Sequence, residues 1–447
     1  MTRALLGVAL VAVSLVGCTH YTPAPPELET FPAALEARRL DEKPAGSTWT
    51  GGELLAAALR RNPQVSEAKA KYLTAAAAAY TAKLSPPLTL TLTAEYAGEK
   101  PRWGYGAAAD IPLDAGVRRS ARMSTADLQA LQAWYDYAEA AWAVRTALER
   151  ARIDLASAGA SIALADQAVA LRRDRLQRLE RRVAAGEDDR VLALTAQTEL
   201  AAAERRFADV VGRRDQGKVD LAKALGVSPA AVNDLVLAPV AMVPPLVGLA
   251  AWRRDAALTR RDVLRALADY DLAETALRLE VAKQYPEVRL GPGYTYDHGV
   301  DKLPFNLSLA LPTWDLNRRA IDQAETARSA AGRSLEVVQA SVLSSVDTAA
   351  AALATANANI DRVELRALPA ARRTAEGTTR ALRAGAADRV EDLAAQAAAL
   401  DAEIDLADAR RAAATAAADL EDALRRPFDP TESTVLQAAL PTPGETR

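Results

Sequence analysis

The stretch Leu88–Thr93 (Leu-Thr-Leu-Thr-Leu-Thr) alternates apolar and hydroxyl side chains without a break. Alternation with a period of two is typical of a β-strand with one apolar and one polar face. A turn follows through 98–101, and the chain returns through 103–113. The sequence therefore predicts a β-hairpin at about 86–113, with strands of about ten residues, long enough to cross a bilayer when tilted.

A second hairpin is predicted at about 286–313, where 305–311 (Phe-Asn-Leu-Ser-Leu-Ala-Leu) again alternates. Aromatic residues are scarce in this chain but gather in the two hairpins, where a membrane protein places its interfacial girdles. We expect such a girdle to be formed by Tyr96, Trp103, Tyr105, Tyr294, Tyr296, Phe305 and Trp314.

The two hairpins belong to a tandem duplication. Val65 and Tyr72 recur as Val263 and Tyr270, and Ala-Gly-x-x-Asp-Arg-Val at 185–191 recurs at 384–390. An ordered series of matches whose offset stays between 198 and 200 residues indicates a repeat of the whole unit. We divide the chain into 1–17, a signal peptide; 18–47, an N-terminal arm; 48–236, the first copy; 237–248, a Pro-rich linker; 249–426, the second copy; and 427–447, a flexible tail.

Long helices are predicted after each hairpin. Residues 114–183 contain no proline and almost no glycine, and alanine, the strongest helix former, is abundant. A helix of about 70 residues would be about 100 Å long, more than a compact domain needs. Ile162, Val169, Leu176 and Val183 are spaced as in a coiled-coil seam. The predicted fold class is mainly α with two membrane β-hairpins per protomer.

The repeated motif interrupts these helices at about 184–190 and 383–389. Glycine after a long helix is typical of a helix C-terminus, and an aspartate shortly afterwards can cap the next helix. Each copy is therefore predicted to form a helical hairpin whose tip points away from the β-hairpins.

The N-terminus resembles a bacterial lipoprotein signal. A basic start at 1–3 precedes an apolar run too short to span a bilayer, which ends in Leu15-Val16-Gly17-Cys18. In a lipobox of this form the cysteine is acylated and becomes the first residue of the mature protein. Thr19 is not the aspartate that retains such lipoproteins in the inner membrane, so we expect a lipid-anchored outer-membrane protein.

Composition excludes most other classes of function. One cysteine and two histidines leave no cluster for a metal site, and no nucleophile elbow, phosphate loop or dinucleotide fingerprint occurs. Acidic and basic residues are interspersed and nearly balanced, which gives no basic patch for nucleic acid. We expect no enzymatic activity, no cofactor and no metal.

Two hairpins supply only four strands, and an open sheet edge is forbidden within a bilayer. Three chains would supply twelve strands, enough for a closed barrel with an open lumen. The membrane interpretation therefore requires a homotrimer.

Taken together, the lipobox, the tandem halves and the paired glycine-containing tips resemble the TolC-like outer-membrane factor family, in its lipoprotein branch. The resemblance implies a homotrimeric twelve-stranded barrel that continues into a periplasmic helical tunnel. It further implies docking of the tips on a periplasmic adaptor protein, which connects the duct to an inner-membrane pump of the RND type.

The same resemblance implies roles for individual residues. Members close the periplasmic end with acidic residues after the second tip, where this chain has Glu391 and Asp392; the alternative is that these acids only favour the start of a helix. The residues implied in adaptor docking are Gly186, Asp189, Arg190, Gly385, Asp388 and Arg389. Turn formation and helix capping alone would also account for these tip residues.

Two rival functions remain open from the sequence. One is a periplasmic coiled-coil lipoprotein with a structural or adaptor role and no pore, against which the alternating hairpins count. The other is the outer-membrane duct of a type I protein secretion system. The exported substrate is not encoded in any motif of this chain.

Overall fold

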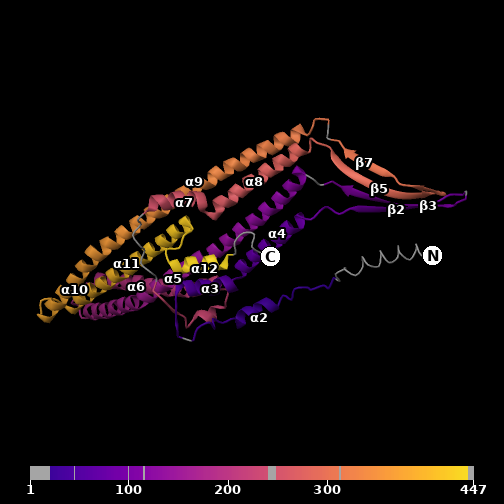
Figure 1. The fold of residues 1–447 in the computed structure, drawn as a ribbon. Helices are drawn as coiled ribbons and strands as arrows, with labels where there is room; N and C mark the ends of the chain where they lie inside the picture. The colour runs from indigo at the N-terminus through magenta and orange to yellow at the C-terminus, as the bar shows by residue number, and fades with distance from the viewer. Residues whose placement is uncertain are drawn as a thin grey trace.

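The computed structural model describes residues 21–44, 46–98, 100–113, 116–239, 248–311 and 314–440. The molecule is elongated, with the β-strands at one end and the tips of two helical hairpins at the other (Figure 1). The longest helix, α5 (Val117–Ala184), has 68 residues, which corresponds to about 100 Å at 1.5 Å per residue. The expected class of long helices with two β-hairpins is confirmed.

The two copies repeat one order of elements. The first contains α3 (Gly51–Arg61), α4 (Pro63–Ala82), β2 (Thr89–Tyr96), β3 (Trp103–Pro112), α5 and α6 (Arg190–Leu225). The second contains α7 (Leu249–Thr259), α8 (Arg261–Ala282), β5 (Glu287–Asp297), β6 (Val300–Lys302), β7 (Phe305–Ala310), α9 (Arg318–Arg362), α10 (Leu368–Arg383) and α11 (Arg389–Leu424). A π-helical turn, Val363–Ala367, joins α9 to α10. It lies directly before Pro369, which cannot donate a backbone hydrogen bond to the preceding turn.

Local chemistry explains where the helices of the first copy begin. Thr50 and Glu53 form a reciprocal capping box at α3. Asn62 accepts a hydrogen bond from the amide of Gln64, and Pro63 occupies the first turn of α4, where its missing N–H costs nothing.

The strands form one antiparallel sheet in the order β2-β3-β5, with β6 and β7 both paired to β5. The two hairpins are joined through β3 and β5, where Tyr105 pairs with Tyr296 and Ile111 pairs with Leu290. In the single chain β2 therefore forms one outer edge of the sheet, and β7 with the short β6 forms the other.

The largest core surrounds the middle of α5. Trp142 and Leu148 of α5 are buried there with Leu54 of α3, Leu225 of α6 and Leu436. A short parallel pair, β1 (Thr48–Trp49) and β4 (Val236–Leu237), and the 3-10 turn η1 (Pro229–Val232) complete this region. Elsewhere the helices meet through smaller clusters in which alanine is buried together with valine, leucine or isoleucine.

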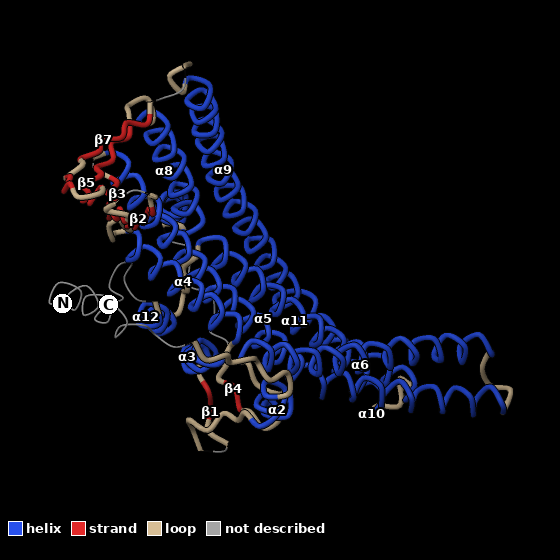
Figure 2. The backbone as a smooth tube through the Cα atoms, turned by 90° about the vertical axis from the view of Figure 1, so that its right-hand side faces the viewer, coloured by secondary structure: helices blue, strands red, loops and turns tan. Residues whose placement is uncertain are grey.

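Two predictions for the chain ends are wrong in part. The tail expected to be flexible from 427 contains α12 (Pro430–Ala439), which Asp429 caps and which buries Leu436 in the core. Its proline occupies the first turn, where proline favours a helix rather than breaking one. The N-terminal arm, whose prolines suggested an extended linker, contains the helix α2 (Thr30–Ala37) (Figure 2). Arg38, directly after this helix, donates to the carbonyl of Arg61 at 3.2 Å. The linker at 240–247, the residues after 440 and Cys18 lie outside the described residues.

Candidate functional site

The β-sheet has two chemically different faces. The register places Leu90 beside Ala109, Leu92 beside Ala107 and Leu290 beside Leu307, so apolar side chains stand on one face across β2, β3, β5 and β7. The leucines of the two outer strands are the most exposed of these in the single chain: Leu90, Leu92 and Leu307 are 59%, 72% and 57% exposed. An apolar surface of this extent on a sheet indicates contact with lipid or with another protein.

The opposite face is polar and lined by small residues. It carries Thr89, Thr91, Thr93, Gly104, Gly106, Gly291, Gly293, Thr295, Asn306 and Ser308. Near the helical end of the sheet, Asp110 and Arg289 form an ion pair at 2.8 Å, and Arg118 pairs with Glu287 at 2.9 Å. The hydroxyl, amide and charged side chains of this face are suited to contact with water.

Six of the seven predicted girdle residues lie towards the turns of the hairpins. Tyr96 contacts Trp103 edge to face at 5.1 Å between ring centroids, and Tyr105 stacks on Tyr296 at 4.9 Å. Tyr294 lies in β5 two residues before Tyr296, and Phe305 begins β7. Trp314, fully exposed, stands instead at the helical end.

Sequence reasoning missed two aromatic residues, Tyr80 and Tyr285, which are 72% and 71% exposed at the helical end of the sheet. Their position at the junctions between helix and strand was the signal that could have identified them. With Trp314, they place aromatic side chains at both ends of the strands.

The two tips are built in the same way. Gly186 and Gly385 adopt φ of 75° and 72°, the left-handed region that glycine occupies without strain. The amide of Glu187 donates to the carbonyl of Arg182 at 2.9 Å, and Ala386 donates to Ala381 at 2.8 Å. These bonds satisfy the last carbonyl groups of α5 and α10.

The predicted aspartates cap the returning helices. Asp189 accepts a hydrogen bond from the amide of Val191 at 3.0 Å, and Asp388 accepts one from the amide of Glu391 at 2.8 Å. The two arginines of the motif differ: Arg389 pairs with Asp392 at 2.5 Å, whereas Arg190 is exposed and has no ion pair among the described residues.

A residue that the sequence did not reveal connects the two tips. Arg182, in the last turn of α5, donates to Asp388 at 2.6 Å and to Asp188 at 3.1 Å. Burial acts to raise the pKa of Asp388, but hydrogen bonds from the Glu391 amide and Arg182 outweigh it and hold the pKa below its usual 3.8. The ion pair between Arg182 and Asp388 thus connects the ends of the two helical hairpins.

The adjacent acids Glu391 and Asp392 lie in different environments. Asp392 is completely buried and accepts hydrogen bonds from Thr379 at 2.6 Å, Arg389 at 2.5 Å and Gln396 at 2.9 Å. Glu391 is exposed, and the described residues give it no ion pair. Within one protomer, Asp392 therefore holds α10 to α11, and only Glu391 presents a carboxylate outward.

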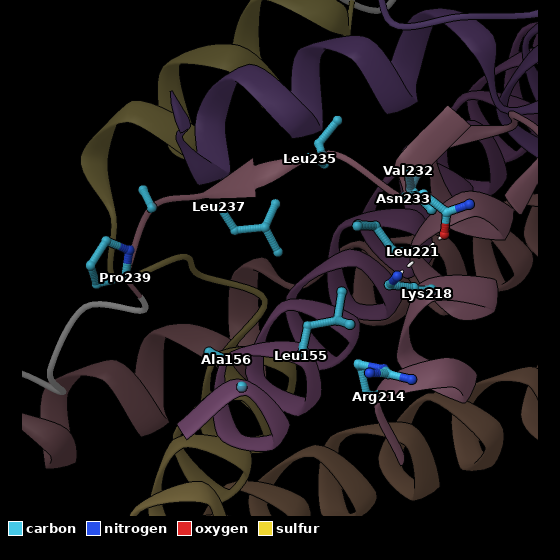
Figure 3. A pocket seen from close by; sticks show the side chains of 12 residues that line it. Leu155, Ala156, Arg214, Lys218, Leu221, Val232, Asn233, Leu235, Leu237 and Pro239 are labelled. Carbon is cyan, nitrogen blue, oxygen red and sulfur yellow. Dashed lines mark hydrogen bonds between the residues drawn. The ribbon is translucent and has the colours of Figure 1, made fainter. Parts of the chain in front are cut away.

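An apolar cavity of about 320 Å³ lies between α5, α6 and β4 (Figure 3). Leu155, Leu221 and Leu237 line it. The two cations at its edge already have partners, since Arg214 pairs with Asp215 and Lys218 donates to Asn233 at 3.2 Å. This cavity therefore offers no free charge for a ligand.

The comparisons with known proteins agree with this geometry. The model of the family described as "Outer membrane efflux protein" matches residues 54–227 and 252–424, one match for each copy. No curated protein matches the chain by sequence.

Several solved structures share the fold. VceC from Vibrio cholerae is 20% identical, with a TM-score of 0.69 over 85% of this chain and 97% of that one. The CmeC outer membrane channel of Campylobacter jejuni is 12% identical, with a TM-score of 0.69 over 94% and 98% of the two chains. The open state of the MtrE outer membrane channel of Neisseria gonorrhoeae is 18% identical, with a TM-score of 0.66 over 92% and 98%.

Proposed function

The chain belongs to the outer membrane efflux protein family, and we propose that three copies of it form one barrel and one tunnel for export. Membership of the family makes the protein an outer-membrane efflux channel rather than an enzyme. The observation that carries the proposal is the sheet, which has one apolar face, one polar face and two outer strands. Within a bilayer those outer strands must pair with other chains.

The positions of the helices also support the proposal that neighbouring protomers close the structure into a ring. In the order of the sheet, α4 leads into β2 and α9 follows β7, so these two helices lie at the edges where a neighbouring protomer would pack. Both edges expose apolar side chains, including Leu73 of α4 at 45% and Val337 of α9 at 67%. A ring of three protomers would cover these side chains and make a wall around a lumen.

The periplasmic partners are proposed from the tips. Channels of this family work with a periplasmic adaptor and an inner-membrane pump, and we assign the docking surface to both tips, with Gly186, Asp189 and Arg190 in the first. The apolar side chains of Val191, Leu192 and Leu194, which are 61%, 46% and 51% exposed, adjoin that tip. Gly385, Asp388 and Arg389 occupy the equivalent position in the second tip. We further assign the pump to the RND type, so that the transport energy comes from the pump.

The gate is assigned to Glu391. Three copies at the narrow end of a tunnel would make a ring of carboxylates that attracts cations and hinders anions. Asp392 would support this ring by holding α10 against α11, since its own carboxylate is fully bonded.

We also propose that Cys18 carries the lipid that anchors the protein in the outer membrane. Acylation can be tested by labelling cells with a fatty-acid probe. Wild-type protein should be labelled and Cys18→Ala should not; persistent label on the variant would refute the assignment.

Electron microscopy of the detergent-extracted protein tests the channel itself. A hollow three-fold tube about 100 Å or more in length is expected from α5. A monomer, or a solid rod without a lumen, would contradict the proposal and favour a coiled-coil lipoprotein. Which substrate is carried can then be tested by export assays with the pump present, with a small drug and a secreted polypeptide as alternatives.

A further inference from the structure

A second cavity, of about 320 Å³, lies between α5, the start of α8 and the end of α11. Unlike the apolar cavity beside β4, it is lined by three arginines, Arg260, Arg261 and Arg425. Trp134 and Tyr135 of α5 form an aromatic wall beside them. Its size lies at the lower end of the range for small-molecule sites.

Two of these arginines replace residues that suit the backbone better. The internal repeat that aligns Val65 with Val263 places Arg261 at the position of Pro63, in the first turn of its helix. Proline is favoured at that position, and the first copy has it. The second copy therefore has a guanidinium where the first copy has a residue that favours the start of a helix.

The other replacement is at the end of α11. Arg425 occupies the position of Gly226, and both adopt the left-handed conformation at a helix C-terminus, with φ of 50° and 68°. That conformation favours glycine, so an arginine there is strained. Both departures from the first copy place a cation at the same cavity.

The three guanidinium groups are not equally satisfied. Arg260 donates to Asp262 at 2.6 Å and to the carbonyl of Ala423 at 2.5 Å. Arg425 pairs with Glu139 at 3.0 Å and with Asp422 at 2.6 Å.

Arg261 is the exception, because the described part of the chain gives it neither an ion pair nor a hydrogen bond for its side chain. Burial lowers the pKa of Arg261 below its usual value and outweighs the attraction of Glu139, and the charge of Arg425 adds to the lowering. An anion bonded to the Arg261 guanidinium would offset the cost of burying that group without a partner.

We propose that this cavity binds a small aromatic carboxylate, with the carboxylate on Arg261 and the ring against Trp134. A guanidinium binds a carboxylate through two parallel hydrogen bonds, and an aromatic wall accepts a flat apolar ring.

A second copy of the chain is a poor candidate for the occupant. The cavity lies between α5 and α8, which pack on each other inside the protomer. In the proposed trimer the neighbour meets α4 and α9 instead. The site is therefore assigned to a free molecule.

Benzoate is the probe, titrated calorimetrically into the detergent-extracted full-length protein, with benzamide as the neutral analogue. Benzoate should bind saturably and benzamide should not. Arg261→Pro, which restores the residue of the first copy, should weaken benzoate binding at least about tenfold, the loss expected for a charge-assisted hydrogen bond. Arg261→Gln should do the same without altering the backbone.

Arg253→Ala is the matched control, because Arg253 pairs with Asp347 on α9 and does not line the cavity. It removes one positive charge and should leave benzoate binding unchanged. Absence of saturable binding by the wild type, or equal binding by wild type and both Arg261 variants, would overturn the proposal. Because binding is measured without a pump, its failure would be distinct from a failure of the channel.

Discussion

Arg182 Nη1 lies 2.6 Å from Oδ2 of Asp388, although the two residues are 206 positions apart in the chain. Arg182 ends the first long helix, and Asp388 is the N-cap of α11. One side chain of the first copy thus binds the residue that organises the tip of the second. We call this contact the inter-tip pair.

Removing the inter-tip pair should loosen the periplasmic end. Both side chains are partly exposed, 35% and 45%, so each pair contributes little to stability by itself. Loss of all three pairs in a trimer should still shift the equilibrium towards an open periplasmic end. Arg182→Gln should therefore conduct better than wild type in planar bilayers. The control is Arg173→Gln, whose partner Glu204 lies within the first helical hairpin. Equal conductance of the two variants would contradict the prediction.

The inter-tip pair should resist mild acid. Because the folded-state pKa of Asp388 lies below its usual 3.8, folding favours the ionised carboxylate. This contribution to stability is complete above pH 3.8 and is lost as the pH falls through the folded-state pKa. The difference in thermal midpoint between wild type and Arg182→Gln should therefore be constant from neutral pH to about 3.8 and narrow below it. A difference that disappears near pH 6 would show that another group controls the pair.

The buried ion cluster at α12 should be essential for stability. Arg145 is 3% exposed and lies 2.7 Å from both Glu421 and Glu432. Arg145→Met would leave the buried carboxylate of Glu421 without a cation and that of Glu432 with only Arg152 at 3.7 Å. The substitution should cost about 3–5 kcal/mol in the free energy of unfolding.

Glu432→Gln should cost less, because burial already raises the pKa of Glu432 despite the attraction of Arg145. Chemical denaturation gives the two costs, and protease cleavage before α12 reports whether the helix has detached. Equal costs for Arg145→Met and Glu432→Gln would contradict this account of the cluster.

The two faces of the sheet should respond oppositely to charge. Leu92 stands on the apolar face opposite Ala107, and its neighbour Thr93 stands on the polar face opposite Gly106. A lysine facing lipid near the midplane costs about 2–4 kcal/mol, so Leu92→Lys should reduce the amount of protein in the outer membrane. Thr93→Lys should assemble normally and lower cation conductance. Normal assembly of both variants would argue against a lipid-facing surface.

The two acids after the second tip should have separable roles. Glu391→Gln should reduce the preference for cations over anions, since it removes the outward carboxylate. Asp392→Asn should leave selectivity in place but destabilise the tip, because it weakens the bonds to Arg389, Thr379 and Gln396. Selectivity in bilayers and proteolysis of the tip measure the two effects independently. An unchanged selectivity of Glu391→Gln would remove the gate assignment.

Much of the architecture follows from local patterns. The alternation at 88–93 and 305–311 places strands because each side chain faces opposite its neighbour. The glycines at 186 and 385 mark the tips because few other residues adopt a positive φ without strain. α12 was not predicted because the four prolines between 427 and 443 suggested a loop, whereas Pro430 begins a helix.

The sequence by itself determined the duplication, the β-hairpins, the long helices and their turning points, because these depend on periodicity and on the backbone preferences of single residues. Only the tertiary structure decided that Arg182 binds Asp388 and that Asp392 is buried while Glu391 is exposed. It also decided that Arg261 lines a cavity with Trp134 and has no ion pair to any residue that the structure describes. Those facts depend on distances between segments far apart in the chain, where the packing of whole helices sets which charges meet.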